Sequence, residues 1–417
     1  MTSTSAGGRH RRAALGAALA VVAGIAAACS PTRSTTAPTT TTTTRSSPSS
    51  APTPTATTPE ATATAPPTTS APTRPWTAGC VTPVGSWPLP DRLAQLLLVG
   101  GQFAALGASA AAAQAGVGGF VLFGQPPAGS GPQITAGIAA LQADAAAAGQ
   151  VAPWMSTDEE GGLVARLASV IGALPAPRQM AAQWTPAQVQ AQLAARGKAM
   201  RALGITMDLA PVLDTAPPTD TIADENDRSF SEDGQVAASY GVAFAAGLRQ
   251  AGVVPVVKHF PGLGHASANT DLGPATDPPL AQLQNPDLVP FRAAIAAGDP
   301  VVMVGHPMVP GLTGGLPASL SPATYDLLRT TLHFTGATIT DSLAAGAISA
   351  AGYSQPAAAV TAIEAGADMA MVGAGAGAWP AALIALEQAV STGRLSLTTV
   401  DGAVHHILSV KALPACR

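Results

Sequence analysis

Residues 253–265 read VVPVVKHFPGLGH. The apolar run at 253–257 is short enough to be one buried strand. Lys258 and His259 follow it directly, and a proline and two glycines at 261–264 then allow the backbone to turn sharply. Polar groups at the mouth of a buried strand, followed by a polar loop, are typical of an active site. The alternative is a lysine that reaches solvent beside a structural histidine.

This unit of strand, polar end and helix recurs along the chain from about residue 90. The Ala-rich stretches Thr185–Leu203 and Glu232–Ala251 are two of the expected helices. The expected strands are Leu96–Val99, Gly119–Phe123, Pro153–Ser156, Ile205–Leu209, Val254–Val257, Val301–Val304, Ala337–Ile339 and Met369–Val372. Eight strands that alternate with helices predict an α/β fold with parallel strands, closed into a single (β/α)8 TIM-like barrel. A doubly wound open sheet is the alternative, but no GxGxxG motif follows the first strand.

Polar residues recur at the carboxyl ends of successive expected strands, where barrel enzymes carry their active sites. They are Asp158, Glu159, Glu160 and Arg166 after the third strand, Asp208, Asp214 and Arg228 after the fourth, Lys258 and His259 after the fifth, His306 after the sixth and Asp341 after the seventh. Taken singly, Asp208 and Asp214 suit loop caps equally well, and we expect Glu159 to face solvent. Together, the series predicts a polar pocket at this end of the barrel.

Composition excludes several classes of function. Only 11% of the 417 residues are charged and the net charge is −4, so no basic patch for nucleic acid is expected. The chain has no CxxC motif and no clustered His/Cys set, so we expect neither a metal site nor a cofactor. We also expect a monomer.

The first 29 residues are typical of an export signal. A basic segment at 9–12 precedes an apolar segment at 13–28, which ends in small residues before Cys29. The pattern resembles a bacterial lipoprotein signal, in which the cysteine becomes the lipidated N-terminus and anchors the protein to the membrane. Ala26 replaces the branched aliphatic residue usual in such signals, so ordinary cleavage is the alternative. No later stretch offers 18 uninterrupted apolar residues for a membrane span.

Residues 30–75 form a Thr/Pro-rich segment with almost nothing apolar to bury. Such a segment cannot offset its ordering entropy and is expected to be a disordered tether. Residues 76–417 are then expected to form the barrel domain, exported and facing the cell wall or periplasm.

The two remaining cysteines, Cys80 and Cys416, lie one at each end of the expected domain. In an exported protein, such a pair predicts a disulfide rather than two free thiols. The bond would clip the N-terminal segment to the last helix.

Six blocks of the sequence carry a resemblance to a known family. They are DEEGGLVAR at 158–166, GITMDLAPVLD at 204–214, RSF at 228–230, KHFPG at 258–262, PASLS at 317–321 and TDSL at 340–343. In order and spacing these blocks resemble the signatures of family 3 glycoside hydrolases. The nearest branch is the single-domain bacterial β-N-acetylhexosaminidases, and the resemblance extends from about residue 90 to 412.

The resemblance implies roles for individual residues. Asp341 would be the nucleophile of a retaining hydrolase, attacking the anomeric carbon to form a glycosyl-enzyme. The residues implied to hold the sugar are Asp158, Arg166, Arg228, Lys258 and His259. Carboxylate, cationic and imidazole groups suit this role because they form charge-assisted hydrogen bonds to ring hydroxyls.

The loop after Gly264 departs from the family pattern. The family branch carries Asp-Ser-His there, with the histidine as acid/base, whereas this chain has Asn269, Thr270 and Asp271. It also has His265 where the family tends to carry an aspartate. Three hypotheses follow: His265 is the acid and Asp271 pairs with it, Asp271 is itself the acid, or the loop is impaired and the protein mainly binds sugar.

The resemblance implies an exo-β-N-acetylglucosaminidase that acts on peptidoglycan fragments or related glycans. A lipid-anchored glycan-binding protein without its acid is one alternative, although the retained aspartate in the nucleophile block favours an enzyme. A β-glucosidase is another, although two-domain glucosidases of this family take their acid from a second domain. The natural glycan, and whether phosphate competes with water as the acceptor, stay open.

Overall fold

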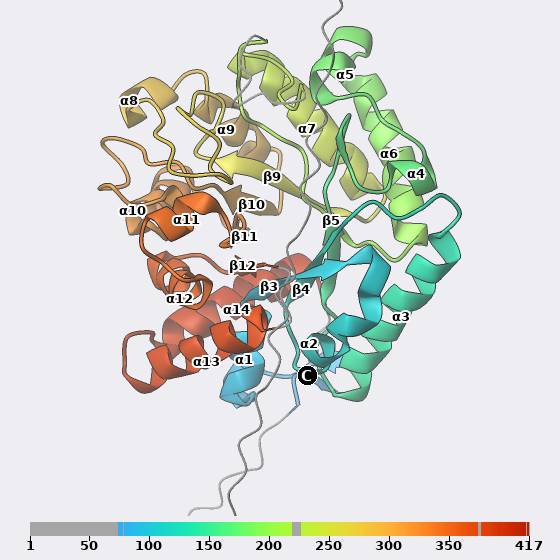
Figure 1. Ribbon diagram of the computed structural model, residues 1–417, viewed down its shortest axis with the longest axis vertical. Coiled ribbons are helices and arrows are strands. Elements are labelled where there is room, and N and C mark those ends of the chain that lie inside the picture. Colours follow the sequence, from blue (N-terminus) through green and yellow to red (C-terminus); the bar gives the residue numbers. More distant parts are fainter. Residues whose placement is uncertain (1–73, 78, 219–226, 374–376, 414, 417) are drawn as a thin grey trace, which may run out of the picture. The chain divides into compact units, whose positions relative to one another are not determined.

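The computed structural model describes residues 74–77, 79–218, 227–373, 377–413 and 415–416, and its centre is a barrel of eight parallel strands (Figure 1). In chain order the barrel strands are β3 (Leu97–Gln102), β4 (Gly119–Phe123), β5 (Trp154–Thr157), β8 (Met207–Asp208), β9 (Val254–Phe260), β10 (Val301–Val304), β11 (Ala337–Thr340) and β12 (Ala370–Val372). Each strand pairs in parallel with the next, and β12 pairs with β3. A parallel bridge between Ile339 and Met369 joins β11 to β12 and closes the ring.

Helices surround this barrel. They are α1 (Leu89–Gln95), α2 (Ala110–Gln114), α3 (Gly131–Ala147), α4 (Ala168–Ile171), α5 (Pro177–Gln183), α6 (Pro186–Ala202), α7 (Gly234–Gln250), α8 (Leu280–Leu283), α9 (Leu288–Ala296), α10 (Pro322–Asp326), α11 (Gly346–Ala350), α12 (Gln355–Ala365), α13 (Ala378–Ser391) and α14 (Leu397–Lys411). Short 3₁₀ segments lie at Val84–Ser86, Phe103–Ser109 and Ala318–Leu320, with a π-helical turn at Leu327–Thr331. The described part of the chain also contains two small hairpins, β1 (Trp76–Thr77) with β2 (Cys80–Val81) and β6 (Glu159–Gly161) with β7 (Val164–Ala165).

Local sequence explains where the long helices begin. Thr185 and Gln188 form a capping box at the start of α6, each side chain bonding the other's backbone N–H. The Asp233 side chain accepts hydrogen bonds from the first amides of α7. Where α6 and α7 pack together, Gly197 and Gly247 have no side chain, and this lets the two helices approach closely. A Cβ atom at either position would clash with its neighbours.

The structure confirms the barrel and places all eight expected strands within a few residues of their predicted bounds. The closed ring excludes the open doubly wound sheet. The largest differences are at β3, which continues to Gln102, and at β9, which continues through Lys258, His259 and Phe260. The extension of β9 exists because Phe260 still pairs with Val304 of β10 across a register shift.

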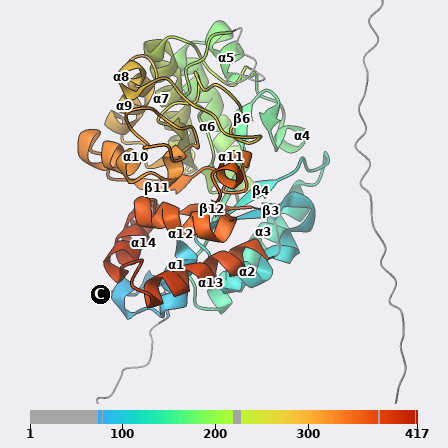
Figure 2. The ribbon, with the colours of Figure 1, turned by 60° about the vertical axis from the view of Figure 1, so that its left-hand side comes forward.

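The termini of the described region meet at the amino-terminal end of the barrel. The predicted disulfide between Cys80 and Cys416 is present, with the two Cα atoms 5.0 Å apart. Lys411 Nζ donates to the carbonyls of Gly118 (3.1 Å) and Ala152 (2.9 Å), just before β4 and β5 begin. Figure 2 shows α1 beside α13 and α14 at this end.

Residues 1–73 lie outside the described part of the chain. They include the expected signal at 1–29 with Cys29, and all but the last two residues of the expected tether at 30–75. Among the helices that the structure does describe, none is long and apolar enough to cross a membrane.

Candidate active site

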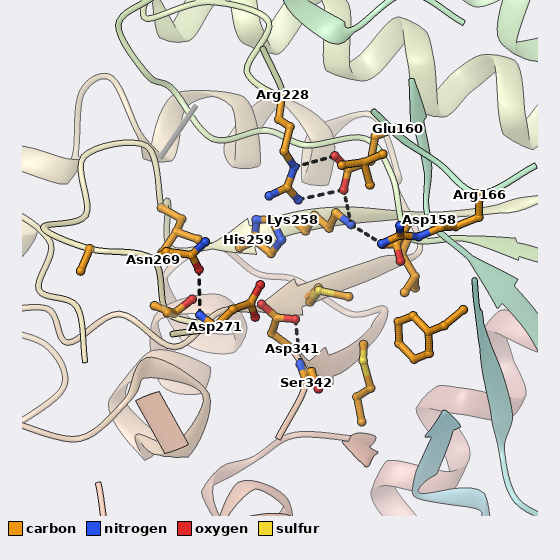
Figure 3. Close-up of a pocket in the computed structure, with 18 residues that line it drawn as sticks. Asp158, Glu160, Arg166, Arg228, Lys258, His259, Asn269, Asp271, Asp341 and Ser342 are labelled. Atoms are coloured by element: carbon orange, nitrogen blue, oxygen red, sulfur yellow. Dashed lines mark hydrogen bonds and ion pairs between the residues drawn. The ribbon is translucent and has the colours of Figure 1, made fainter. Parts of the chain in front are cut away.

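A cavity of about 270 Å³ opens at the carboxyl ends of the barrel strands (Figure 3). Its polar lining is Asp158, Glu160, Arg166, Arg228, Lys258, His259, Asn269, Thr270, Asp271, Asp341 and Ser342, and its apolar lining includes Phe123, Leu209, Met303 and Met371. The structure therefore brings together, around one cavity, all but one of the catalytic and sugar-binding residues expected from the sequence. The exception is His265.

A buried network of charges forms one wall. Lys258 Nζ lies 2.8 Å from Asp158 Oδ1 and 2.7 Å from Glu160 Oε1. Arg228 binds Glu160 through two nitrogens, at 2.8 and 2.9 Å. Burial alone would raise the pKa of Glu160, but the charges of Arg228 and Lys258 hold it well below its ordinary value. Glu160 therefore stays ionised, the carboxylates in turn raise the pKa values of Arg228 and Lys258, and the ion pairs fix the positions of the side chains.

Arg166 lies at the edge of this wall, after the β6–β7 hairpin. Its backbone N–H donates to the Asp158 carbonyl at 3.1 Å, which ties the two residues together. Its Nε is buried and has no hydrogen-bond partner among the described residues. Since a buried guanidinium N–H without a partner is costly, this donor is suited to a hydroxyl of a bound ligand.

His259 is oriented by Asp214. The Nδ1 of His259 lies 2.6 Å from Asp214 Oδ2, while Asp214 Oδ1 accepts the backbone amides of His259 (3.1 Å) and Leu263 (2.9 Å). Asp214, which the sequence alone placed equally well as a loop cap, thus fixes both the imidazole and the start of the next loop. With Nδ1 bound to the carboxylate, Nε2 is the nitrogen left to face the cavity.

Asp341 follows β11 at the floor of the cavity. Its Oδ1 accepts the Ser342 amide at 2.7 Å, and its own amide donates to the Val304 carbonyl at 2.8 Å. Burial alone would raise the pKa of Asp341, but the imidazole of His259 and the hydrogen bond from Ser342 lower it below the ordinary value. Asp341 is therefore held as a carboxylate.

His306 supports the turn that carries Asp341. Its Nδ1 lies 2.7 Å from Ser319 Oγ, and its Nε2 lies 2.9 Å from the Ser342 carbonyl oxygen. Because a carbonyl only accepts, Nε2 carries the proton, and Nδ1 accepts from the serine hydroxyl. Burial lowers the pKa of His306, which agrees with this neutral form.

Asp271 lies at the tip of the loop after β9, and Figure 3 shows its side chain pointing toward Asp341. The Asn269 side chain accepts the Asp271 amide at 2.8 Å and shapes the tip. Burial raises the pKa of Asp271, and the negative charge of Asp341 raises it further. Two carboxyl groups thus share the cavity with pKa values moved in opposite directions.

His265 does not pair with Asp271 as one hypothesis expected. Its Nδ1 lies 3.0 Å from Asp287 Oδ1, and the same carboxylate oxygen accepts the Thr215 hydroxyl at 2.9 Å. His265 cannot reach Asp271 because Gly264 packs directly on the Thr215 backbone, which holds His265 at the base of the loop. Asp271 lies six residues further on, at the tip.

The expectation that Glu159 faces solvent is wrong. Its side chain is fully buried, 2.9 Å from Arg196 Nη2 on α6, and its Oε2 accepts the Leu167 amide at 2.8 Å. Burial, only partly offset by Arg196, raises the pKa of Glu159 to about 7. Asp208 Oδ1 accepts a hydrogen bond from the Glu159 backbone amide at 2.9 Å. Both acids therefore stabilise the turn after β5.

Sequence reasoning also missed Glu160, which it quoted but gave no role. Side chains alternate along an extended segment, so Asp158 and Glu160 share the cavity face while Glu159 points the other way. That alternation is the signal that could have found Glu160.

Within the part of the chain that the structure describes, no group of three or more His, Cys, Asp or Glu side chains is placed to hold a metal ion.

Comparison with known proteins agrees with this geometry. The chain matches the family described as "Glycosyl hydrolase family 3 N terminal domain" over residues 89–410. It is 41% identical over 340 residues to the β-hexosaminidase LpqI of Mycobacterium tuberculosis, covering 78% of this chain and 84% of that protein.

Solved structures give the same result. The M. tuberculosis LpqI structure superimposes with a TM-score of 0.74 at 38% identity, covering 82% of this chain and all of that one. A family 3 glycosyl hydrolase from Mycobacterium smegmatis gives 0.72 at 40% identity, with coverage of 79% and 98%. A β-N-acetylhexosaminidase from Beutenbergia cavernae gives 0.71 at 31% identity, with coverage of 78% and 99%. With the barrel, the charged cavity and these matches in agreement, the chain belongs to glycosyl hydrolase family 3 and is a glycoside hydrolase.

Proposed function

We propose that the protein is a retaining exo-β-N-acetylglucosaminidase in which Asp341 is the nucleophile and Asp271 is the acid/base. One observation carries this proposal: both carboxyl groups line one small cavity, and their surroundings move their pKa values apart. A lowered pKa favours the ionised form of Asp341 needed for attack, and a raised pKa favours the protonated form of Asp271 needed for donation. Separation of this kind is how two carboxyl groups take different roles.

The reaction then runs in two displacements. Asp341 attacks the anomeric carbon through an oxocarbenium-like transition state, while Asp271 gives its proton to the departing glycosidic oxygen. A glycosyl ester on Asp341 results, together with the free aglycone. Asp271, now a carboxylate, takes a proton from water, whose oxygen attacks the anomeric carbon and releases Asp341. Configuration at the anomeric carbon is retained.

Asp271 is preferred to His265 as the acid because of position. Asp271 lines the cavity beside Asp341, whereas His265 lies at the base of the loop on Asp287 and is not among the lining residues. A place in the cavity lining and a raised pKa thus support the proposal of Asp271 as the acid, which was one of three hypotheses from the sequence.

The charged wall is proposed to hold the sugar. Asp158, Arg166, Arg228, Lys258 and His259 offer fixed donors and acceptors for ring hydroxyls, and Glu160 locks two of the cations in place. A cavity of about 270 Å³ is smaller than the roughly 300–1,000 Å³ typical of sites for drug-sized ligands. It suits one terminal sugar, which supports exo cleavage.

The names of the relatives support β-linked N-acetylhexosamine as the substrate class, and fragments of peptidoglycan or related glycans are the proposed natural source. This source fits the N-terminal sequence. We propose that residues 1–29 direct export, that Cys29 is lipidated, and that residues 30–75 tether a monomeric barrel domain, residues 76–417, outside the membrane.

Assays of the purified protein on aryl β-N-acetylglucosaminide and aryl β-glucoside test the proposal. We expect turnover of the first and at most slow turnover of the second. We also expect no increase in rate with phosphate, because the Asp271 carboxylate left by the first step repels an anionic acceptor beside the anomeric carbon. Preference for the glucoside would make the protein a β-glucosidase, and sugar binding without turnover would make it a binding protein.

A further inference from the structure

The tip of the Asp271 loop rests on the segment that follows the nucleophile. Gly346, the first residue of α11, donates its backbone N–H to the Asp271 carbonyl at 2.8 Å. Ala347 donates to the Thr270 carbonyl at 3.0 Å. Among the described residues, these are the hydrogen bonds that join residues 269–273 to another segment of the chain. The base of the loop has separate anchors at Leu263 and His265.

The contact at Gly346 is too close for any side chain. A Cβ atom built there would lie 2.5 Å from the carbonyl carbon and oxygen of Leu272, and 2.8 Å from the amide nitrogen of Gly273. These are backbone atoms, so no rotamer change would relieve the clash. The φ of Gly346 is outside the left-handed region, so glycine is required here for space rather than for conformation.

Asp341 and Gly346 belong to one short, well-held segment. Between them, the Leu343 amide donates to the Met371 carbonyl at 2.9 Å and the Ala345 amide to the Ser342 carbonyl at 3.0 Å. The start of this segment carries the nucleophile and its end carries the loop tip. The separation between the two carboxyl groups is therefore fixed through a few residues of the barrel rim.

We propose that Gly346 is a positioning residue, which sets the reach of Asp271 over the anomeric centre by letting the loop tip dock on α11. The inference rests on the proposed role of Asp271. A methyl group at 346 would push the tip outward, because the barrel rim on its other side is held by β11 and β12. The nucleophile and the sugar-binding wall would stay in place.

Gly346→Ala tests this through the leaving group. A dinitrophenyl leaving group needs little protonation, whereas a sugar leaving group needs a great deal, so kcat/KM on the two substrates separates acid function from the rest of the site. A displacement of about 1 Å can cost about 100-fold in rate. We expect kcat/KM on a GlcNAc-terminated disaccharide to fall by roughly that factor and kcat/KM on the dinitrophenyl glycoside to change by less than about 3-fold.

Two glycines provide matched controls. Gly273 lies on the same loop and Gly402 lies within α14, and a Cβ atom at either position would meet nothing within 4 Å. Gly273→Ala and Gly402→Ala should leave both values of kcat/KM unchanged. Added azide, which attacks the glycosyl-enzyme without base help, should raise kcat for the dinitrophenyl glycoside with Gly346→Ala and not with the controls.

The outcomes separate this inference from the proposed function. If wild-type protein turns over neither substrate, the proposed function fails. Should wild type be active while Gly346→Ala keeps its full rate on the disaccharide, docking at residue 346 does not position the acid. Equal losses on both substrates, with a lowered melting temperature, would make Gly346 a structural residue only and would also overturn the inference.

Discussion

Asp271 and Asp341 carry the same functional group, and only their surroundings distinguish them. Asp341 faces an imidazole and accepts a backbone amide, which stabilise its charge. Asp271 belongs to an exposed loop tip, but its carboxyl group is partly desolvated in the cavity beside Asp341, so ionising it would place a second negative charge there. The charge of the nucleophile thus favours the protonated form of the acid it works with.

This arrangement predicts the pH dependence. The nucleophile must be ionised, so kcat/KM should fall as pH drops through the lowered pKa of Asp341. The acid must be protonated, so kcat/KM on a disaccharide should fall as pH rises through the raised pKa of Asp271, above the ordinary aspartate value of 3.8. The pH profile of wild type on a disaccharide and on a dinitrophenyl glycoside checks this.

The fall in kcat/KM at high pH, the alkaline limb of the pH profile, should appear with the disaccharide and be absent with the dinitrophenyl glycoside. Asp271→Ala, assayed on the dinitrophenyl glycoside, should keep the acidic limb because Asp341 is untouched. An alkaline limb that persists on the disaccharide with Asp271→Ala, at an undiminished rate, would assign it to another group.

At the scale of elements, several contacts hold the loop after β9, among them Leu263 on Asp214, His265 on Asp287, and the tip on α11. His265 is about one-third exposed, and its partner Asp287 is buried at the start of α9. In this account the histidine anchors the base of the loop, while the aspartate at the tip performs the chemistry.

We therefore expect His265→Ala to weaken the loop without removing the acid. The disaccharide rate should fall by roughly 10-fold or less, well short of the 10²–10⁴-fold that loss of a general acid costs. The alkaline limb of the pH profile should remain, since Asp271 is present. His265→Asn, which can still donate to Asp287, serves as the conservative control. A loss with His265→Ala as large as that with Asp271→Ala, together with loss of the alkaline limb, would make His265 the acid.

The sequence predicted elements better than it predicted which side chains meet. Strand positions followed from apolar runs such as 301–304, which the structure reproduces at both ends. The partner of His265 could not be predicted, because Asp287 lies 22 residues further along the chain, beyond the loop itself. The burial of Glu159 depended on Arg196 of α6, a contact that no local pattern reveals.

At the scale of the molecule, the catalytic cavity and the disulfide that joins the two ends of the domain lie at opposite ends of the barrel. The cavity lies at the carboxyl ends of the strands, while the Cys80–Cys416 disulfide and Lys411 lie at the opposite end. Repetition of one strand–helix unit made the barrel and this polarity predictable. The disulfide was predictable from cysteine count and export alone, without its surroundings.

The disulfide should stabilise the domain without affecting the site. It links residues 336 positions apart, for which the chain-entropy treatment gives about 6 kcal/mol before any strain in the native state is subtracted. The double variant Cys80→Ser, Cys416→Ser should unfold at a lower temperature than wild type and keep the kcat/KM of wild type below that temperature. Thermal unfolding of wild type with and without reductant provides the control. An unchanged melting temperature in both comparisons would show that the bond adds no stability.

The most direct test of the two-carboxylate account is to trap the covalent intermediate on the wild-type protein. A GlcNAc fluoride with a second fluorine at C5 destabilises the oxocarbenium-like state but keeps a good leaving group, so a glycosyl-enzyme should accumulate. Peptide mapping by mass spectrometry should find one added sugar on the peptide that contains Asp341, and none on Asp341→Asn. An adduct on any other residue, or turnover of the inactivator with inversion and no adduct, would contradict the account.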